Sequence, residues 1–203
     1  YCFDITERKR AEEGLRRYAD RLQVLHETDQ AILAARLAEE IVEAALNHLR
    51  RLVPCMRASV CLFDLEAGEL SLLAVLADGE TWLGKGERAS LEWAWFVDEI
   101  GQGQIYVVED LLSIPPSSPW VQGLLAEGVR SFVSVPLVVE GKMFGALNVG
   151  MDSPGIPSPE HEETIREAAI QLAIGVHQAH LREQIQQHAV ELEQRVAERT
   201  AAL

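Results

Sequence analysis

The side chains best able to do chemistry in this chain are three cysteines, and their spacing argues against a metal site or a disulfide framework. Cys2, Cys55 and Cys61 are an odd number, and they are not arranged in pairs at a metal-binding spacing. We predict that they are reduced thiols and that Cys61 is a buried apolar side chain within a strand.

Two other sets of polar residues could support metal binding or acid–base catalysis. His177 and His180 are three residues apart, but no third ligand accompanies them, which favours histidines on the surface or at a dimer interface. Glu109 and Asp110 are adjacent carboxylates without a nucleophile beside them. Asp110 is interpreted as a turn or cap residue, or as a hydrogen-bond acceptor for a ligand. We predict no catalytic residue and no metal ligand, so the chain is not itself an enzyme.

The aromatic residues point to a different kind of site. All four tryptophans fall between positions 82 and 120, in a stretch of turns and short helices. A cleft lined by aromatic rings and a few polar groups suits a flat small molecule. Aromatic rings also fill cores without binding anything, and the sequence leaves both possibilities open.

Charge and hydropathy limit the partners. Eighteen basic and 32 acidic side chains give a formal net charge of -14, and such a surface repels nucleic acid and anionic lipid. No stretch reaches the roughly 20 apolar residues that cross a bilayer, and no signal peptide opens the sequence. We therefore predict a cytoplasmic location, no nucleic-acid partner and no membrane contact by this fragment.

Long helices are predicted at both ends of the sequence. After Thr6, apolar residues recur every three or four positions, and the helical pattern continues until Pro54. Ser158 followed by Pro159 predicts the start of the last helix. Heptad spacing in both helices predicts coiled coils that join two copies of the chain as a homodimer. The predicted seam, meaning the apolar stripe at that interface, consists of Leu15, Leu22, Leu25, Ile185, Leu192 and Val196.

Between these helices the sequence predicts a sheet. Runs of β-branched and aromatic residues predict strands at 59–63, 70–77, 105–108, 131–139 and 143–149, with short helices at 91–100 and 119–126. The predicted fold class is α+β, with a central, mostly antiparallel sheet of five to six strands, helices on both faces and long coiled-coil helices at the two ends.

Three motifs resemble known families. Residues 4–12, DITERKRAE, resemble the end of a PAS domain, and residues 192–203, LEQRVAERTAAL, resemble the linker before the dimerisation domain of sensor histidine kinases. The middle resembles a GAF domain through GVRSFVSVPL at 128–137 and GALN at 145–148. The resemblance implies the end of a PAS domain and a linker helix at 1–21, a GAF domain at 22–181, and a signalling helix at 182–203 that leads to a kinase.

The GAF resemblance also implies a ligand pocket between one sheet face and the loops and short helices beside it. Strand alternation places Phe132 and Ser134 on one face and Val133 on the other. The implied lining is Trp82, Trp93, Phe96, Asp110, Trp120, Leu124, Phe132, Ser134 and Asn148.

Known GAF ligands can be compared with this sequence. Covalent bilin is disfavoured because residues 118–121 hold no Cys or His and Trp120 would occupy the chromophore's place. Cyclic nucleotide binding is weakly supported, since Asn148 matches that pattern but Ile156 stands where a Phe is expected. Haem is disfavoured because no histidine is placed inside the implied pocket. The cofactor, if any, is left unnamed.

The resemblance implies a sensory module of a two-component histidine kinase. Such a module binds a small molecule, relays a signal through dimeric helices to a downstream kinase, or does both. The alternative is a ligand-free structural spacer that holds the dimer together between PAS and kinase domains.

Overall fold

The structure of the chain is a computed structural model that describes residues 38–101, 103–115 and 118–201, with side chains only in part beyond residue 182. Contacts divide the chain into two units, and the folded domain is the unit Ala38–Gln178. The predicted N-terminal seam, Leu15, Leu22 and Leu25, and the PAS-like motif lie outside the described residues. Among the described residues, no helix combines the length and hydropathy of a membrane-spanning segment.

A single antiparallel sheet of six strands forms the centre of the domain. Its order is β3-β2-β1-β6-β5-β4, and every neighbouring pair is antiparallel. The predicted antiparallel sheet is confirmed, and its sixth strand is β3, which is too short to leave a sequence pattern. The strands are β1 (Arg57–Asp64), β2 (Glu69–Ala77), β3 (Arg88–Ser90), β4 (Tyr106–Val108), β5 (Ser131–Val139) and β6 (Lys142–Met151).

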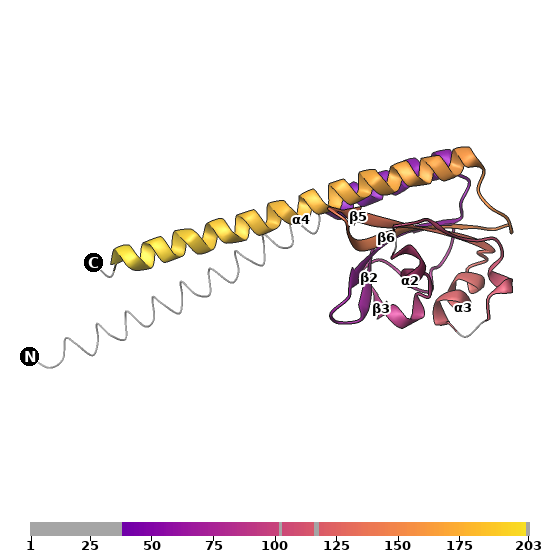
Figure 1. Cartoon of the computed structure of the whole chain (residues 1–203), viewed down its shortest axis with the longest axis horizontal. Helices are drawn as coiled ribbons and strands as arrows, with labels where there is room; N and C mark the ends of the chain where they lie inside the picture. The colour runs from indigo at the N-terminus through magenta and orange to yellow at the C-terminus, as the bar shows by residue number, and fades with distance from the viewer. Residues whose placement is uncertain (1–37, 102, 116–117, 202–203) are drawn as a thin grey trace, which may run out of the picture. The chain divides into compact units, whose positions relative to one another are not determined.

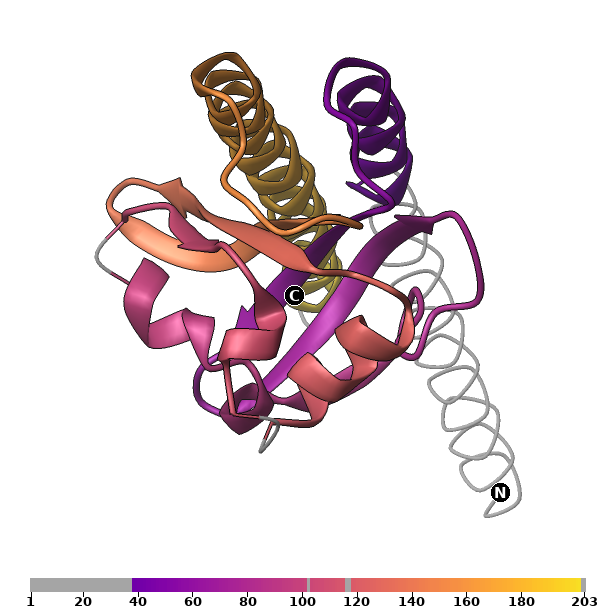
Figure 2. The same cartoon turned by 90° about the vertical axis from the view of Figure 1, so that its right-hand side faces the viewer.

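Helices lie on both faces of this sheet (Figures 1 and 2). The helical segment 38–52 and the first part of α4 (Pro159–Ala201) cover one face, and α2 (Phe96–Ile100) and α3 (Pro119–Ala126) lie on the other. Helix α4 starts as predicted, because the His161 backbone N–H donates to Ser158 Oγ at 3.2 Å and Pro159 is the first helical residue.

The helix predicted at 91–100 is instead two short elements, the 3₁₀ turn η1 (Leu91–Trp93) and α2. Ser90 caps η1 by accepting from the Glu92 backbone N–H at 3.3 Å. Ala94 then leaves the helical region, with φ −93° and ψ 70°, so one continuous helix cannot form. A second 3₁₀ turn, η2 (Leu111–Ser113), follows β4 and was not predicted.

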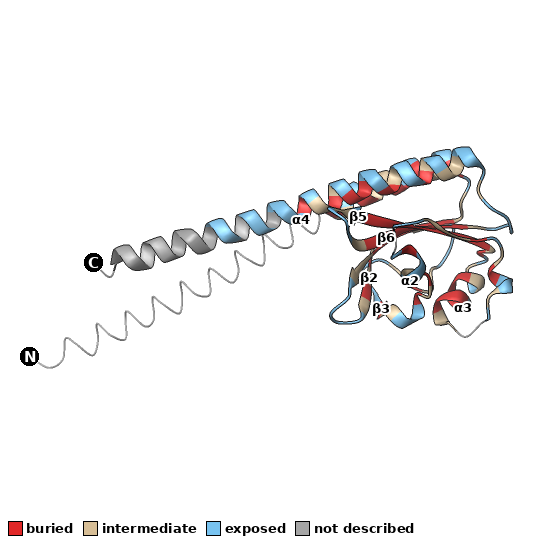
Figure 3. Cartoon of the chain, viewed as in Figure 1, coloured by how far each residue is buried: buried red, intermediate tan, exposed pale blue. Residues whose placement is uncertain are grey.

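The sheet separates two cores, and both of its faces are buried (Figure 3). Alternation along β5 sends Val133 and Val135 into the core beneath the long helices and Phe132 into the opposite core. On the long-helix side Leu46, at 0% exposed, and Leu172, at 1%, reach the same core from the two helices. Burial on both faces explains why the strands of the sheet centre are continuous apolar runs.

The centre of the sheet tolerates no side chain at Gly145 of β6. A Cβ atom there would overlap the Cys61 carbonyl oxygen of β1, which is backbone and cannot rotate away. We expect Gly145→Ala to lower the free energy of unfolding by about 1–3 kcal/mol, measured by urea denaturation. The control is Gly79→Ala in a surface loop, where nothing lies within 4 Å of the added Cβ. Equal stability of the two variants would contradict the register of β1 and β6.

Candidate functional site

A row of polar side chains crosses the centre of the sheet on the face that carries α2 and α3. Strand pairing sets Tyr106 beside Ser134, Ser134 beside Asn148, and Asn148 beside Ser59. Ser59, Ser134 and Asn148 are at most 2% exposed. Ser134 Oγ donates to Asn148 Oδ1 at 2.8 Å, which links β5 to β6. A buried polar row of this kind can orient a ligand or a water molecule, and it can also simply satisfy itself.

Cys61 belongs to this row and is held as a neutral thiol. Asn148 Nδ2 donates to Cys61 Sγ at 3.3 Å, and the thiol donates to the Ala146 carbonyl oxygen at 3.7 Å. Burial raises the pKa of Cys61 to about 12. A thiol that stays protonated is a poor nucleophile, so Cys61 contributes packing and a hydrogen bond.

An aromatic cluster lies over one end of this row. Phe96 of α2 contacts Trp120 of α3 and Phe132 of β5, with ring centroids 5.6 and 5.3 Å apart. Trp82 meets Trp120 edge to face, with centroids 5.7 Å apart. Phe96, Trp120 and Phe132 are at most 1% exposed. The rings therefore pack against one another where α2 and α3 approach the sheet.

Three buried polar atoms on this side have no hydrogen-bond partner among the described residues. They are Ser59 Oγ, Trp82 Nε1 and Trp120 Nε1. A buried donor without a partner costs free energy, roughly 1–3 kcal/mol each. Hydrogen-bonding capacity therefore remains between the sheet and the aromatic cluster.

A buried ion pair fastens α3 to the sheet below the cluster. Arg57 Nη1 of β1 donates to both carboxylate oxygens of Glu127 at 2.7 Å, and the two side chains are 3% and 6% exposed. Glu127 also accepts from the Trp82 backbone N–H at 2.9 Å, and Arg57 Nη2 donates to the Leu83 carbonyl oxygen at 3.2 Å. The two charges are thus paired and hydrogen-bonded, as burial requires.

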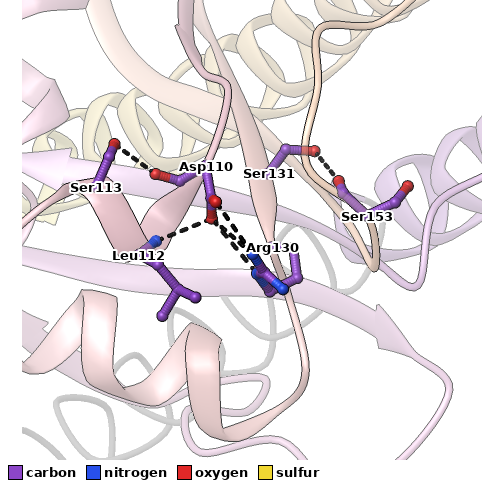
Figure 4. A network of polar contacts seen from close by, with 6 residues as sticks. All are labelled: Asp110, Leu112, Ser113, Arg130, Ser131 and Ser153. Carbon is purple, nitrogen blue, oxygen red and sulfur yellow. Dashed lines mark hydrogen bonds and ion pairs between the residues drawn. The ribbon is translucent and has the colours of Figure 1, made fainter.

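A second polar network surrounds Asp110 and joins β4 to β5 (Figure 4). Arg130 Nη2 donates to both Asp110 carboxylate oxygens, at 3.0 and 3.2 Å, and the Leu112 backbone N–H donates to Oδ1 at 3.0 Å. Ser113 Oγ donates to the Asp110 carbonyl oxygen at 2.6 Å. Nearby, Ser131 Oγ donates to the Ser153 carbonyl oxygen at 2.8 Å. The hydrogen bond from Arg130 is the main reason why the pKa of Asp110 lies below its ordinary value.

The implied pocket residues occupy three different settings. Trp93 is 37% exposed on η1, where its carbonyl oxygen accepts from Ser118 Oγ at 2.5 Å. Asp110 caps η2 and pairs with Arg130, so both of its carboxylate oxygens have partners. The other seven lie on the α2–α3 side of the sheet: Trp82, Phe96, Trp120, Leu124, Phe132, Ser134 and Asn148.

The sequence predicted Cys61 as a buried side chain of a strand, which is confirmed, but it did not single out Ser59, Arg57 or Glu127. Ser59 and Cys61 follow from strand alternation, because they alternate with the core residues Ala58 and Val60. Arg57 and Glu127 are 70 positions apart and carry no local signal for their pairing. Among the described residues, no group of three or more His, Cys, Asp or Glu side chains could hold a metal ion.

A comparison with protein-family models identifies the family of this domain. The GAF domain model matches residues 38–176. The chain belongs to the GAF domain family. The match ends close to the limits of the folded unit Ala38–Gln178.

Relatives of this GAF domain include signalling proteins. The chain is 26% identical over 198 residues to the circadian input-output histidine kinase CikA of Thermosynechococcus vestitus, a match that covers 89% of this chain and 26% of the kinase. The chain thus spans about a quarter of that relative's length.

Solved structures share the fold at lower identity. The GAF domain of a two-component sensor histidine kinase from Bacillus halodurans superposes with a TM-score of 0.62 at 21% identity, covering 70% of this chain and 95% of that one. The blue-light-absorbing form of the PixJ GAF domain from Thermosynechococcus elongatus also gives 0.62, at 20% identity, covering 75% and 92%.

The Asp110–Arg130 pair predicts a pH-dependent contribution to stability. Because the folded pKa of Asp110 is lowered from 3.8, its stabilisation is present above that value and is lost as the pH falls through the lowered pKa. Asp110→Asn keeps an N-cap side chain but removes the charge. We expect the Tm difference between wild type and Asp110→Asn, measured by calorimetry, to be constant above pH 5 or so and to close in strong acid.

Asp110→Ala is the matched control, since it removes the cap as well as the charge. Its deficit in Tm should persist at low pH. A wild-type advantage over Asp110→Asn that stayed constant to the lowest pH would show that the ion pair contributes nothing through its charge.

Proposed function

We propose that this GAF domain is a non-catalytic regulatory module of a two-component sensor histidine kinase, which relays a signal to the kinase through paired helices. The observation that carries the proposal is helix α4. It is one continuous helix from Pro159 to Ala201 that begins on the domain core and extends beyond the domain unit, which ends at Gln178. A change in the domain core therefore has a continuous helix along which to act.

The surface of α4 supports pairing with a second copy. One side of the helix is anchored in the core, with Ile165 and Leu172 at most 1% exposed. Exposed apolar residues recur at spacings of four and seven, the pattern of a coiled-coil seam. This stripe consists of Ile170 at 59% exposed, Ile174 at 45%, Leu181 at 41% and Ile185 at 69%.

Within the domain unit, part of the stripe lines an apolar groove of about 450 Å³. Ile170 and Ile174 form one wall, and Val135 and Val138 of β5 form the other. Exposed apolar side chains that gather along one side of a helix and a neighbouring groove are typical of protein interfaces. The side chains of Leu192 and Val196, also in the predicted seam, lie outside the described ones.

The similarity to histidine kinases supports the proposal that the signal is passed to a kinase domain. The relative that matches 89% of this chain is a histidine kinase, and structural neighbours come from two-component sensor kinases. Because the chain spans 26% of that kinase, the PAS and kinase domains around it, and the cytoplasmic location of the whole, are part of the proposal. The net charge of -14 supports a module without nucleic-acid or lipid partners.

Small-molecule sensing is a second candidate, which the unpartnered Ser59 hydroxyl and Trp82 and Trp120 indole N–H groups favour. The close packing of Phe96 on Trp120 and Phe132 instead favours a ligand-free spacer. The relay requires only the helices, so it is compatible with either state of the aromatic cluster.

Pairing through the stripe predicts that one exposed isoleucine controls the oligomeric state. We expect the 203-residue chain to be a dimer in light scattering and Ile185→Glu to be a monomer, because a buried carboxylate at the seam is not tolerated. Ile156→Glu, the same substitution at an isoleucine that is 67% exposed in the loop before α4, is the matched control and should remain dimeric. A wild-type monomer, or equal dissociation of both variants, would refute the pairing.

Native mass spectrometry distinguishes a ligand-bound aromatic cluster from a ligand-free one. If the cluster holds a ligand, the folded protein carries an excess mass that is lost on denaturation, and Ser59→Ala lowers its occupancy. An unmodified mass from cells and from purified protein would favour the spacer reading for the domain core. We expect the unmodified mass, because Phe96, Trp120 and Phe132 are already packed together.

A further inference from the structure

The loop 78–87, between β2 and β3, contacts elements that belong to opposite faces of the sheet. Its centre, Trp82 and Leu83, packs in the core of α2 and α3. Two of its charged residues, Asp78 and Lys85, pair with the helical segment 38–52. The loop is therefore a connection between the aromatic cluster and the helix that leads into the domain.

On the α3 side the contacts of the loop are buried and specific. The Trp82 backbone N–H donates to Glu127 at 2.9 Å, and the Leu83 carbonyl oxygen accepts from Arg57 at 3.2 Å. The Trp82 indole lies directly against Gly123 of α3, where any Cβ would overlap the ring. A shift of α3 must consequently move Trp82.

On the helix side the contacts are ion pairs at the surface. Lys85 Nζ lies 2.7 Å from Glu43 Oε1 and 2.9 Å from Glu39 Oε2, and Arg50 pairs with Asp78. Each such pair is individually weak because water screens it. Together these pairs attach the loop to the helical segment 38–52 at two places, near residue 50 and near residues 39–43.

The position of the Lys85 contacts gives them a role beyond stability. Glu39 and Glu43 are in the first described turns of this helical segment, next to Ala38, where the domain unit begins. At the same level Ile41 packs closely on α4, because a Cβ at Gly175 would come within 2.9 Å of the Ile41 side chain. Lys85 therefore pairs with the helical segment 38–52 at the level where that segment packs on α4.

We propose that the loop 78–87 is a conformational bridge. It couples the packing of Trp82 on α3 to the stability of residues 38–43, where the helical segment 38–52 packs on α4. A role for this bridge in signalling rests on the proposed relay. The coupling between Trp82 and residues 38–43 does not, because it lies within the domain. Trp82 and Lys85 are its two positioning residues.

The coupling is tested from the α3 side by Gly123→Ala in the whole chain. The added methyl group displaces the Trp82 ring, and hydrogen exchange is followed by mass spectrometry. We expect backbone amides at 38–44 to exchange faster by roughly two- to fivefold, the range set by losing weak surface ion pairs. Unchanged exchange at 38–44 in a folded Gly123→Ala protein would overturn the bridge.

The reverse direction uses Lys85→Glu, a surface change that leaves the core intact. The protein is labelled with 5-fluorotryptophan, and the four ¹⁹F signals are assigned with single Trp→Phe variants. We expect Lys85→Glu to shift the Trp82 signal, whereas Lys142→Glu, at an exposed lysine of β6, leaves it in place. A Trp82 signal that is identical in both variants would overturn the proposal even if Gly123→Ala fails to fold.

These readouts do not depend on the oligomeric state. A chain that proves monomeric but shows the exchange and ¹⁹F changes would retain the bridge and lose the relay. A dimer without those changes would retain the relay and lose the bridge.

Discussion

Burial of both sheet faces is the constraint on which the rest of this structure depends. A six-stranded sheet covered on both sides leaves no face where polar side chains can be solvated. Each polar residue on the central strands must therefore find a partner inside the protein. Ser134, Asn148 and Cys61 satisfy one another, and Arg57 is neutralised by Glu127. The one exception in this row, Ser59 Oγ, marks where the domain keeps unused hydrogen-bonding capacity.

The same constraint explains what could be predicted from the sequence. The strands at 131–139 and 143–149 and the start of α4 at Ser158 were predictable, because alternation, turn and cap signals are local. The faces of Phe132 and Val133 followed from the period of two. The three-residue strand β3 and the break at Ala94 were not predictable, because their cause is tertiary packing and not a local pattern.

The candidate site was predictable in composition but not in arrangement. GAF resemblance named seven of the residues that gather on the α2–α3 face, but it could not show that their rings would contact one another. Nor could it assign Asp110 to Arg130, since the pairing joins residues 20 positions apart, one just after β4 and the other just before β5. The Arg57–Glu127 pair is the extreme case: replacing either partner would leave a buried charge, a loss of about 3–5 kcal/mol, yet neither residue stands out in the sequence.

The anchoring of α4 limits how a signal can travel along it. Ile165, Ala169, Leu172 and Val176 are at most 6% exposed in the long-helix core, so turning the helix about its axis until this side faces solvent would expose them all. Burying one such aliphatic side chain contributes about 1.5–3 kcal/mol, and the sum exceeds the coupling energies of about 1–3 kcal/mol that are typical between sites. A relay in this domain must therefore use movements that keep the core contacts and change the exposed side of the helix. Ile170 and Ile174 are on the same helix but outside the core. Their packing can change without exposing the core residues, and so within a coupling energy of about 1–3 kcal/mol.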